Sequence, residues 1–307
     1  MHALLVVNPK ATATSERERD ILCRALGSDL KLDVVQTNHR GHAIELGRQA
    51  AESGLDLVVV LGGDGTINEI VNGLLGPGLE PAPDTPALAV VPGGSTNVFS
   101  RALGIANDPV VATSELLDSL RAGRSRRIGL GRVDERWFTF TAGLGIDADA
   151  VRRVERARQK GRAPTPSRYA RATLRSFYAM DRRNPALTLE RPGADPVPGL
   201  FLGIVANTAP WTYFRSRPIV LTPDVTFDSG LDLVAMRRMR LPGTLWAASG
   251  MLTERGIRGR CTEVFTDLAQ FRLTSEVALP LEVDGDYLGE AVGAVFRSVP
   301  GALRVVA

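Results

Sequence analysis

Apolar and polar residues alternate along the first third of the chain in a pattern that predicts strands and helices in turn. Apolar segments at residues 4–7, 32–36, 55–61 and 87–91 predict strands, and the continuous run at 55–61 is typical of a strand buried on both faces of a parallel sheet. Segments with helical spacing separate and follow these strands, at residues 15–26, 41–52, 66–75, 96–103 and 108–122. This alternation predicts a doubly wound, Rossmann-like α/β domain that binds a nucleotide.

The pattern changes near Arg127. Residues 132–141 alternate, with Asp134, Glu135 and Arg136 as a turn between two strands. Further strand-sized segments are short and bounded by Pro, Gly or Asp, at residues 187–190, 199–206, 231–236, 270–274, 281–284 and 288–290. The second part of the chain is therefore predicted to be a mainly-β sandwich domain. Helical insertions are predicted at 152–180 and 242–255, and a loop rich in Pro, Gly and Asp at 192–198.

A length of 307 residues fits two domains, which the pattern places at residues 1–127 and 128–295. No apolar run approaches the roughly 18–20 residues of a transmembrane helix, and the N-terminus reads as a buried strand rather than a signal peptide. The two cysteines exclude a disulfide framework and a closed zinc site, which fits a reducing cytoplasm.

The net charge of +3 conceals one strongly basic segment. Residues 152–183 contain eleven basic and two acidic residues, a balance of +9, so the rest of the chain carries −6. Aromatic and aliphatic residues interleave with the arginines, which suits a helix at an anionic membrane surface with Arg168, Arg171 and Arg175 facing it. A solvated helical face is the alternative, and nothing else in the chain supports binding of nucleic acid.

The most specific motif is the string from Leu61 to Ile70, Leu-Gly-Gly-Asp-Gly-Thr-Ile-Asn-Glu-Ile, between the most apolar strand and a helix. Glycines there allow a tight turn whose N–H groups face an anion, and the helix directs its positive end to the same place. A second loop, residues 91–97, has the same design, with two glycines and two hydroxyls after a strand. Two such loops at successive strand ends predict a site for the phosphates of a nucleotide.

With these residues the chain resembles the diacylglycerol kinase catalytic family, which includes bacterial lipid kinases, sphingosine kinases and ceramide kinases. The central motif is Gly-Gly-Asp-Gly-Thr-Ile-Asn-Glu at 62–69. Further segments resemble family elements over nearly the whole chain: Asn8-Pro9, Thr37 with Gly41-His42-Ala43, residues 92–97, residues 143–148, residues 229–232 and residues 283–286. The resemblance implies ATP, Mg²⁺ and a lipid hydroxyl such as that of diacylglycerol. It also implies that the last segment, 296–307, returns to the first domain.

Carried over residue by residue, the resemblance implies ATP contacts from Asn8, Thr37, Gly62, Gly63, Asp64, Gly65, Thr66, Asn68, Glu69, Gly94, Ser95, Thr96 and Asn97. It assigns metal contacts to Asp64 and to Thr226, Ser229 and Leu231.

Asp284 and Asp286 are the predicted catalytic carboxylates, with Asp64 as a third. A hydroxyl is a poor nucleophile near neutral pH, so a positioned base that accepts its proton assists phosphoryl transfer. Their spacing would place Asp284 and Asp286 on one face of an extended segment, and a polar turn built on Asp-Gly is the alternative. Asp286 stands where the family usually has Glu, so we expect it to be the base and Asp284 to support it; the reverse assignment stays open.

Three acidic positions of the family are absent, at Val98, Gly129 and Ser229, which leaves the metal arrangement and its effect on activity open. Two other functions therefore remain as alternatives: a small-molecule kinase related to the NAD kinases, and a non-catalytic nucleotide- or lipid-binding relative. The sequence does not reveal which lipid is used, nor whether the chain forms a homodimer. We expect a cytoplasmic protein that associates peripherally with the membrane.

Overall fold

The computed structural model describes residues 1–9, 16–145, 185–214, 216–239, 241–253 and 255–307, which fall into two compact units. Unit 1 comprises Met1–Leu130, Glu135–Trp137 and Pro300–Ala307, and unit 2 comprises Gly131–Asp134 and Phe138–Val299. The predicted helix at 152–180 and the membrane-facing Arg168, Arg171 and Arg175 lie outside the described residues.

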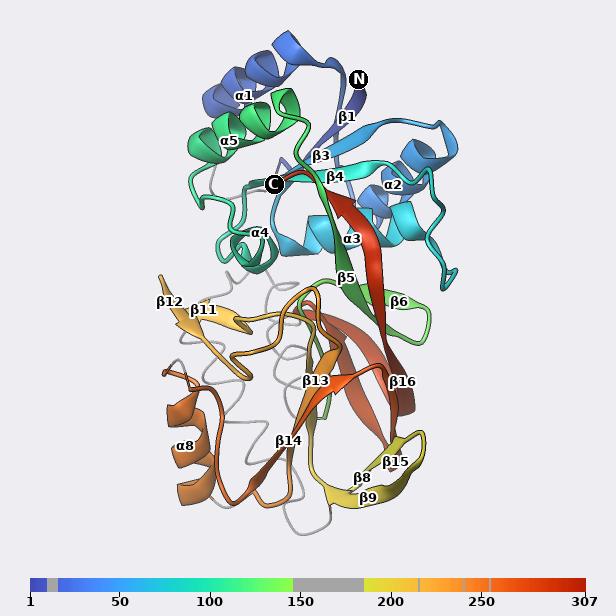
Figure 1. Ribbon diagram of the computed structural model, residues 1–307, viewed down its shortest axis with the longest axis vertical. Coiled ribbons are helices and arrows are strands. Elements are labelled where there is room, and N and C mark those ends of the chain that lie inside the picture. The colour runs from blue at the N-terminus through green and yellow to red at the C-terminus, as the bar shows by residue number, and fades with distance from the viewer. Residues whose placement is uncertain (10–15, 146–184, 215, 240, 254) are drawn as a thin grey trace. The chain divides into compact units, whose positions relative to one another are not determined.

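Unit 1 is an α/β domain around a parallel sheet (Figure 1). Its elements are β1 (His2–Val7), α1 (Glu16–Asp29), β2 (Lys31–Gln36), α2 (His42–Glu52), β3 (Leu57–Gly62), α3 (Asp64–Leu75), β4 (Ala87–Pro92), α4 (Val98–Ala102), α5 (Pro109–Arg121) and the short β6 (Arg136–Phe138). The strands run in the order β4-β3-β1-β2, all parallel. The predicted α/β alternation is confirmed.

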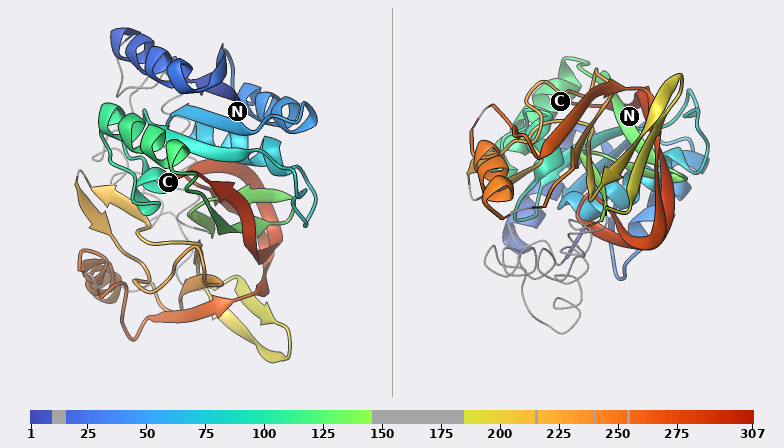
Figure 2. Two further views of the ribbon diagram at one scale, coloured as in Figure 1. Left: turned by 45° about the horizontal axis from the view of Figure 1, so that its top comes forward. Right: turned by 90° about the horizontal axis from the view of Figure 1, so that it is seen from below.

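The apolar runs in the sequence become the core of unit 1. Every residue of β3 and β4 is buried, as expected for strands covered on both faces. One face packs against Leu22 and Leu26 of α1 and Leu116 of α5, while α2 and α3 pack against each other on the other side of the sheet (Figures 1 and 2). The sheet is thus enclosed by two helical layers, and its carboxyl edge carries the loops that lead into α2, α3 and α4.

Unit 2 is mainly β. Two strands pass between the units, β5 (Arg126–Val133) and β16 (Asp286–Val305). The other elements of unit 2 are β7 (Thr141–Leu144), β8 (Leu187–Arg191), β9 (Ala194–Leu200), β10 (Gly203–Ala206), β11 (Thr212–Phe214), β12 (Arg217–Ile219), β13 (Leu231–Met236), α8 (Leu241–Gly250), β14 (Thr262–Leu268) and β15 (Gln270–Val283). Strands β14-β13-β10-β7-β15-β16 follow one another in antiparallel pairs, and their apolar residues form the core of this unit.

The end of β16 joins the parallel sheet of unit 1. Val305 pairs with Leu88 of β4 in parallel, and the Val306 N–H donates to the Leu88 carbonyl at 2.9 Å. The last strand therefore returns to the first domain, as the family resemblance implied. The fold class, a nucleotide-binding type of α/β domain followed by a mainly-β region, is likewise confirmed.

Two sequence predictions in unit 2 were wrong in detail. Residues 192–198 were expected to be a loop, but β9 (Ala194–Leu200) runs through most of them. Among the described residues this strand pairs with β8 alone and lies at an edge of the sheet. An edge strand tolerates Pro196 and Pro198 because its outer side needs no ladder hydrogen bonds. The segments at 270–274 and 281–284 belong to one long strand, β15, because the irregular register between Thr274 and Leu279 interrupts its apolar pattern.

Candidate functional site

Four loops of unit 1 meet at the carboxyl edge of the parallel sheet. Asn8 follows β1, Thr37 follows β2, residues 62–65 follow β3 and residues 92–97 follow β4. The strands are adjacent and parallel, so their carboxyl ends lie at the same edge. In open α/β sheets this edge is where ligands bind.

The two glycine-rich loops touch each other. The Gly93 N–H donates to the Gly62 carbonyl at 2.8 Å. A Cβ on Gly94 would lie 2.7 Å from the Gly63 Cα, and a Cβ on Gly63 would lie 3.1 Å from the Gly94 Cα. Only glycine allows the two backbones to come this close, so the β3–α3 and β4–α4 loops form one continuous surface.

Asp64 links the two loops through its carboxylate. Its two oxygens accept the N–H groups of Val98 and Phe99, each at 3.0 Å, at the first turn of α4. An acidic side chain here satisfies two amides that have no partner within the helix. The family has an acidic side chain at position 98. Here the residue is Val98, and it contributes its backbone N–H, which bonds to Asp64.

Asn97 holds the second loop from within. Its backbone adopts φ 52°, and its side-chain Oδ1 accepts the Gly94 N–H at 2.8 Å. Its Nδ2 is close to both the Gly94 carbonyl, at 2.9 Å, and the Asn107 Oδ1, at 2.8 Å. Asn97 is 2% exposed, so its side chain shapes the loop rather than presenting itself at the surface. Asn107 belongs to no recognisable motif, so sequence reasoning did not select it.

Asn68 and Glu69 likewise bond to the protein. The Glu69 carboxylate accepts the N–H of Gly41 at 2.9 Å and that of Ala43 at 3.3 Å, at the start of α2. Asn68 is buried, and its Nδ2 donates to the Trp137 carbonyl at 3.0 Å while its Oδ1 accepts from Arg136 at 2.6 Å. Both residues were predicted to contact ATP; in the structure these hydrogen bonds position α2 and β6 around α3.

The remaining predicted residues lie at the surface of the loops or line them. Gly65 and Ser95 are exposed, and Thr37, Gly63, Gly94 and Thr96 are half-buried. The Asn8 Nδ2 donates to the Thr66 Oγ1 at 2.9 Å, which ties the end of β1 to the first turn of α3. The structure thus brings the glycines and hydroxyls together at one edge, supported by Asn8, Asp64 and Asn97.

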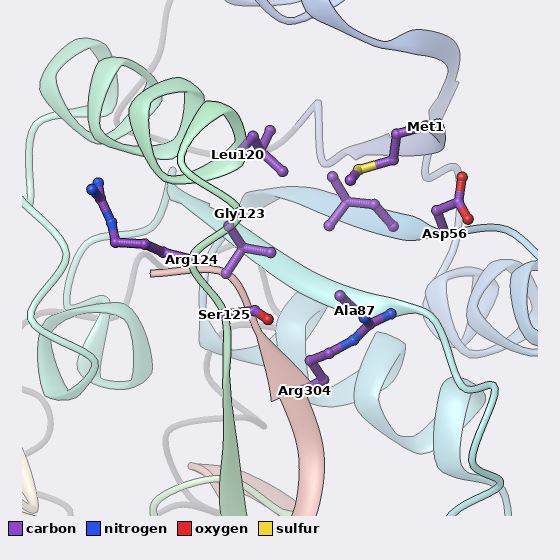
Figure 3. Close-up of a pocket in the computed structure, with 10 residues that line it drawn as sticks. Met1, Asp56, Ala87, Leu120, Gly123, Arg124, Ser125 and Arg304 are labelled. Atoms are coloured by element: carbon purple, nitrogen blue, oxygen red, sulfur yellow. The ribbon is translucent and has the colours of Figure 1, made fainter.

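A pocket of about 410 Å³ lies at the opposite edge of the same sheet (Figure 3). Met1, Asp56 and Ala87 line it where β1, β3 and β4 begin, together with Arg304 and Leu120. Because the strands are parallel, their amino ends lie across the sheet from the glycine-rich loops. This pocket is therefore separate from the candidate nucleotide site.

Asp284 and Asp286 belong to unit 2 and flank a tight turn between β15 and β16. Asp284 has φ 48° and Gly285 φ 82°, and Val283 pairs with Asp286 across the turn. Two successive positive φ angles are typical of a type I′ hairpin turn. The expectation of an extended segment with both carboxylates on one face was wrong, since the local Asp-Gly turn preference prevails.

The turn gives the two carboxylates different surroundings. Asp284 is 7% exposed and accepts four hydrogen bonds: Oδ2 from the Thr139 N–H at 2.7 Å and the Thr139 Oγ1 at 2.8 Å, and Oδ1 from the Phe140 N–H at 3.0 Å and the Thr141 N–H at 3.1 Å. Burial raises the pKa of Asp284, while these hydrogen bonds act in the opposite direction. Asp286 is half-buried and begins β16.

Four donors match the number of lone-pair positions on a carboxylate. Asp284 is therefore arranged to hold residues 139–141 in place, and Asp286 is the more accessible of the two. Thr139, which supplies two of the four donors, was not singled out from the sequence. It lies 145 residues from Asp284, and no local sequence pattern predicts a contact over that separation.

In the segment predicted to hold a metal, residues 226–231, the Ser229 side chain forms hydrogen bonds within the turn. The Ser229 Oγ accepts the Thr226 N–H at 3.0 Å and donates toward the Thr226 carbonyl at 2.9 Å. The Gly230 N–H donates to Asp267 at 2.7 Å. With a hydroxyl in place of a carboxylate and the Thr226 carbonyl already accepting, these residues do not fit a resident Mg²⁺. In the part of the chain that the structure describes, no group of three or more His, Cys, Asp or Glu side chains could hold a metal ion.

Within the described residues, no helix is long and apolar enough to cross a membrane. The family-like segment at 143–148 is only partly described, since the residues after Gly145 lie outside the described ranges.

Comparisons with known proteins match both the sequence of unit 1 and the fold of the whole chain. Residues 2–133 match the family model of the diacylglycerol kinase catalytic domain. The chain is 39% identical over 109 residues to a diacylglycerol kinase of Bacillus subtilis (strain 168), an alignment that covers 36% of this chain and 33% of the relative. It is 32% identical over 149 residues to a diacylglycerol kinase of Staphylococcus aureus (strain MRSA252), covering 47% of this chain and 43% of the relative.

Each of these alignments therefore spans less than half the length of the curated relative. The fold match is broader. A crystal structure of a diacylglycerol kinase from Bacillus anthracis str. Sterne superposes with a TM-score of 0.72 at 18% identity, covering 99% of this chain and 96% of that one. A second structure from the same organism gives a TM-score of 0.76 at 19% identity. Together with the glycine-rich loops at the carboxyl edge of the sheet, the matches show that residues 2–133 are similar to the diacylglycerol kinase catalytic domain.

Proposed function

We propose that this protein is an ATP-dependent lipid kinase that transfers the γ-phosphate of ATP to the hydroxyl of diacylglycerol or a similar lipid alcohol. The observation that carries the proposal is the close contact of Gly63 and Gly94, which joins two phosphate-binding loops at the carboxyl edge of a family-matched domain. Relatives named diacylglycerol kinase support the choice of a lipid acceptor.

The triphosphate of ATP would lie on the two loops. Backbone N–H groups near Gly63 and Gly65 and the hydroxyls of Ser95 and Thr96 would offer donors to phosphate oxygens, and α3 directs its positive end to the same place. Phosphoryl transfer depends mainly on positioning and on neutralising charge. The direct contact of the two loops provides that positioning.

Mg²⁺ is proposed here as the partner of ATP, with Asp64 as the residue of this chain that would contact it. When bound, the ion would neutralise charge on the transferring phosphate. Asp64 suits this role because its carboxylate is half-buried at the loops and is held by the Val98 and Phe99 amides. The residues at 226–231 are not proposed as a metal site.

Asp286 is the proposed general base that accepts the proton of the lipid hydroxyl, and Asp284 is a positioning residue. The accessibility of Asp286 and the four donors on Asp284 support this division. A diacylglycerol substrate resides in a bilayer, so we further propose peripheral association with an anionic membrane. The basic segment at 152–183 would contribute to it.

The test is a transfer assay with γ-labelled ATP and a panel of acceptors: diacylglycerol, monoacylglycerol, a sphingoid base and NAD. We expect label in a phosphorylated lipid, identified by mass, and little in NAD. Label in NAD alone would establish the small-molecule kinase alternative. ATP binding without transfer to any acceptor would establish the non-catalytic alternative. The variant Asp286→Asn is the negative control for lipid phosphorylation.

A further inference from the structure

Helix α8 of unit 2 is apolar and exposes a tryptophan. Its sequence, Leu-Pro-Gly-Thr-Leu-Trp-Ala-Ala-Ser-Gly, contains no charged residue. Trp246, near its middle, is 63% exposed, whereas Trp137 is 0% exposed and Trp211 is half-buried. A single exposed apolar side chain is common, but exposed apolar groups that gather on one surface usually mark an interaction site.

The helix lies on an excursion of the chain between β13 and β14. The two ends of the excursion meet where the Arg237 N–H donates to the Cys261 carbonyl at 2.9 Å. Gly243, in the first turn of α8, faces Cys261 so closely that a Cβ there would lie 2.8 Å from its Sγ. The start of α8 therefore packs closely against its own unit, whereas the side chain of Trp246 remains 63% exposed.

Two more exposed apolar side chains lie on the hairpin bonded to the chain that leaves α8, and on that chain itself. The Val220 N–H, just after β12, donates to the Met251 carbonyl at 2.9 Å, and Arg217 of β12 donates to the Leu252 carbonyl at 2.8 Å. These bonds attach the β11–β12 hairpin to the chain that leaves α8. Phe214 is 52% exposed and Leu252 is 45% exposed. In both Figure 1 and Figure 2, α8 and this hairpin lie along the same side of unit 2. We call Phe214, Trp246 and Leu252 the apolar surface.

The chain around the apolar surface is basic. Residues 237–263 contain six arginines and two glutamates, a balance of +4, and no acidic residue occurs between positions 239 and 253. Arg238 precedes α8, and Arg255, Arg258 and Arg260 follow it; all four are exposed. Two copies of the chain joined through this surface would bring two +4 segments together, which like-charge repulsion opposes. An anionic lipid surface is complementary both to the charge and to the exposed apolar groups.

We propose that α8 is a membrane-insertion element, which places Trp246 at the interface of a bilayer that contains anionic lipid while the surrounding arginines bind the headgroups. Tryptophan favours this interfacial depth because its ring is apolar and its N–H can remain hydrated. The inference rests on the proposed function in one respect: a lipid acceptor brings the protein to a bilayer. The inference places the membrane contact on α8 and its neighbouring arginines in unit 2, and it does not depend on the segment at 152–183.

The test uses the full chain with vesicles of phosphatidylcholine, with or without roughly 30% phosphatidylglycerol as the anionic lipid that attracts basic segments. Lipids brominated on their acyl chains quench tryptophan that enters the bilayer. We expect quenching with the anionic vesicles, and its loss in Trp246→Phe while partition is largely retained. Trp246→Glu should partition roughly tenfold more weakly, since it removes apolar burial and adds a negative charge. Val292→Glu is the matched control, because Val292 on β16 is also 63% exposed, and it should change partition less than about twofold.

Urea unfolding of each variant verifies that the fold is retained. Partition of Trp246→Glu equal to that of the unaltered chain, or equal loss in Val292→Glu, overturns the inference. So does a shift from dimer to monomer in Trp246→Glu by light scattering without vesicles, because the surface would then bind a second copy. Activity on a detergent-dispersed short-chain diacylglycerol separates the two proposals: Trp246→Glu should retain it. If no lipid is phosphorylated but partition depends on Trp246, the kinase proposal fails and the membrane element stands.

Discussion

Replacing Gly94 with alanine should separate the two glycine-rich loops that are proposed to bind the phosphates of ATP. The added Cβ would lie 2.7 Å from the Gly63 Cα and 2.9 Å from the Asn97 Oδ1. Carbon atoms in contact normally lie about 3.5–4.0 Å apart, so the loops must part by about 1 Å. The obstacle is backbone rather than the end of a flexible side chain, and such overpacking costs about 1–3 kcal/mol of stability. A displacement of about 1 Å in positioned groups can reduce turnover by roughly 100-fold.

The structure also ranks the neighbouring substitutions. A Cβ on Gly63 would lie 3.1 Å from the Gly94 Cα, so Gly63→Ala should cause a smaller loss of turnover than Gly94→Ala. Gly27→Ala in α1 is the control, because its Cβ would meet no atom of the described residues outside its own helix within 4 Å. It should leave turnover unchanged and stabilise the protein by up to about 1 kcal/mol, since alanine favours a helix more than glycine does.

The assays are ATP binding by titration calorimetry, lipid phosphorylation, and urea unfolding to separate loss of function from loss of fold. The expected order of loss in ATP affinity and turnover is Gly94→Ala, then Gly63→Ala, then Gly27→Ala. If Gly94→Ala binds ATP and turns over normally while Gly27→Ala behaves as expected, the contact between the loops does not position the nucleotide, and the central reasoning fails.

Three further predictions concern carboxylates of unit 2. Asp286→Asn should lower lipid turnover by about 10²–10⁴-fold with ATP affinity and the urea midpoint unchanged, and Asp286→Glu should restore turnover; a silent Asp286→Asn would remove the base assignment. Asp284→Ala should lower the free energy of unfolding, measured with urea, by about 4 kcal/mol or more, because four buried donors lose their acceptor. A decrease under about 1 kcal/mol would contradict its positioning role. Burial raises the pKa of Asp232. Asp232 therefore stabilises the fold below the ordinary carboxyl pKa, and this stabilisation is lost as pH rises through its pKa in the folded protein. Asp232→Asn should accordingly be more stable than the unaltered chain at pH near 7 and equal to it near pH 4. Urea midpoints at both pH values measure this, and a gap that widens on acidification would reverse the sign.

Local pattern determined the elements of unit 1 and the place of its glycine-rich loops. The run at 55–61 is apolar throughout because β3 is covered on both faces, and the glycines that follow allow the turn into α3. The family motif added the return of the C-terminal segment, which periodicity could not show because Val305 pairs with a strand more than 200 residues earlier, at Leu88. These features depend on neighbouring residues or on a recognisable string, so the sequence carries them directly.

The tertiary structure alone decided which polar side chains serve the fold and which face a ligand. Asn68, Glu69 and Asn97 were all predicted to contact ATP, yet they bond to Trp137, Gly41 and Asn107, which are distant in the sequence or carry no motif. The same holds for Asp284, whose donors lie more than 140 residues away, and for the exposure of Trp246 on an apolar helix. A buried polar group must find a hydrogen-bond partner wherever the fold brings one, and solvent exposure depends on everything packed around a side chain. Neither property has a local period, so neither can be read from the sequence.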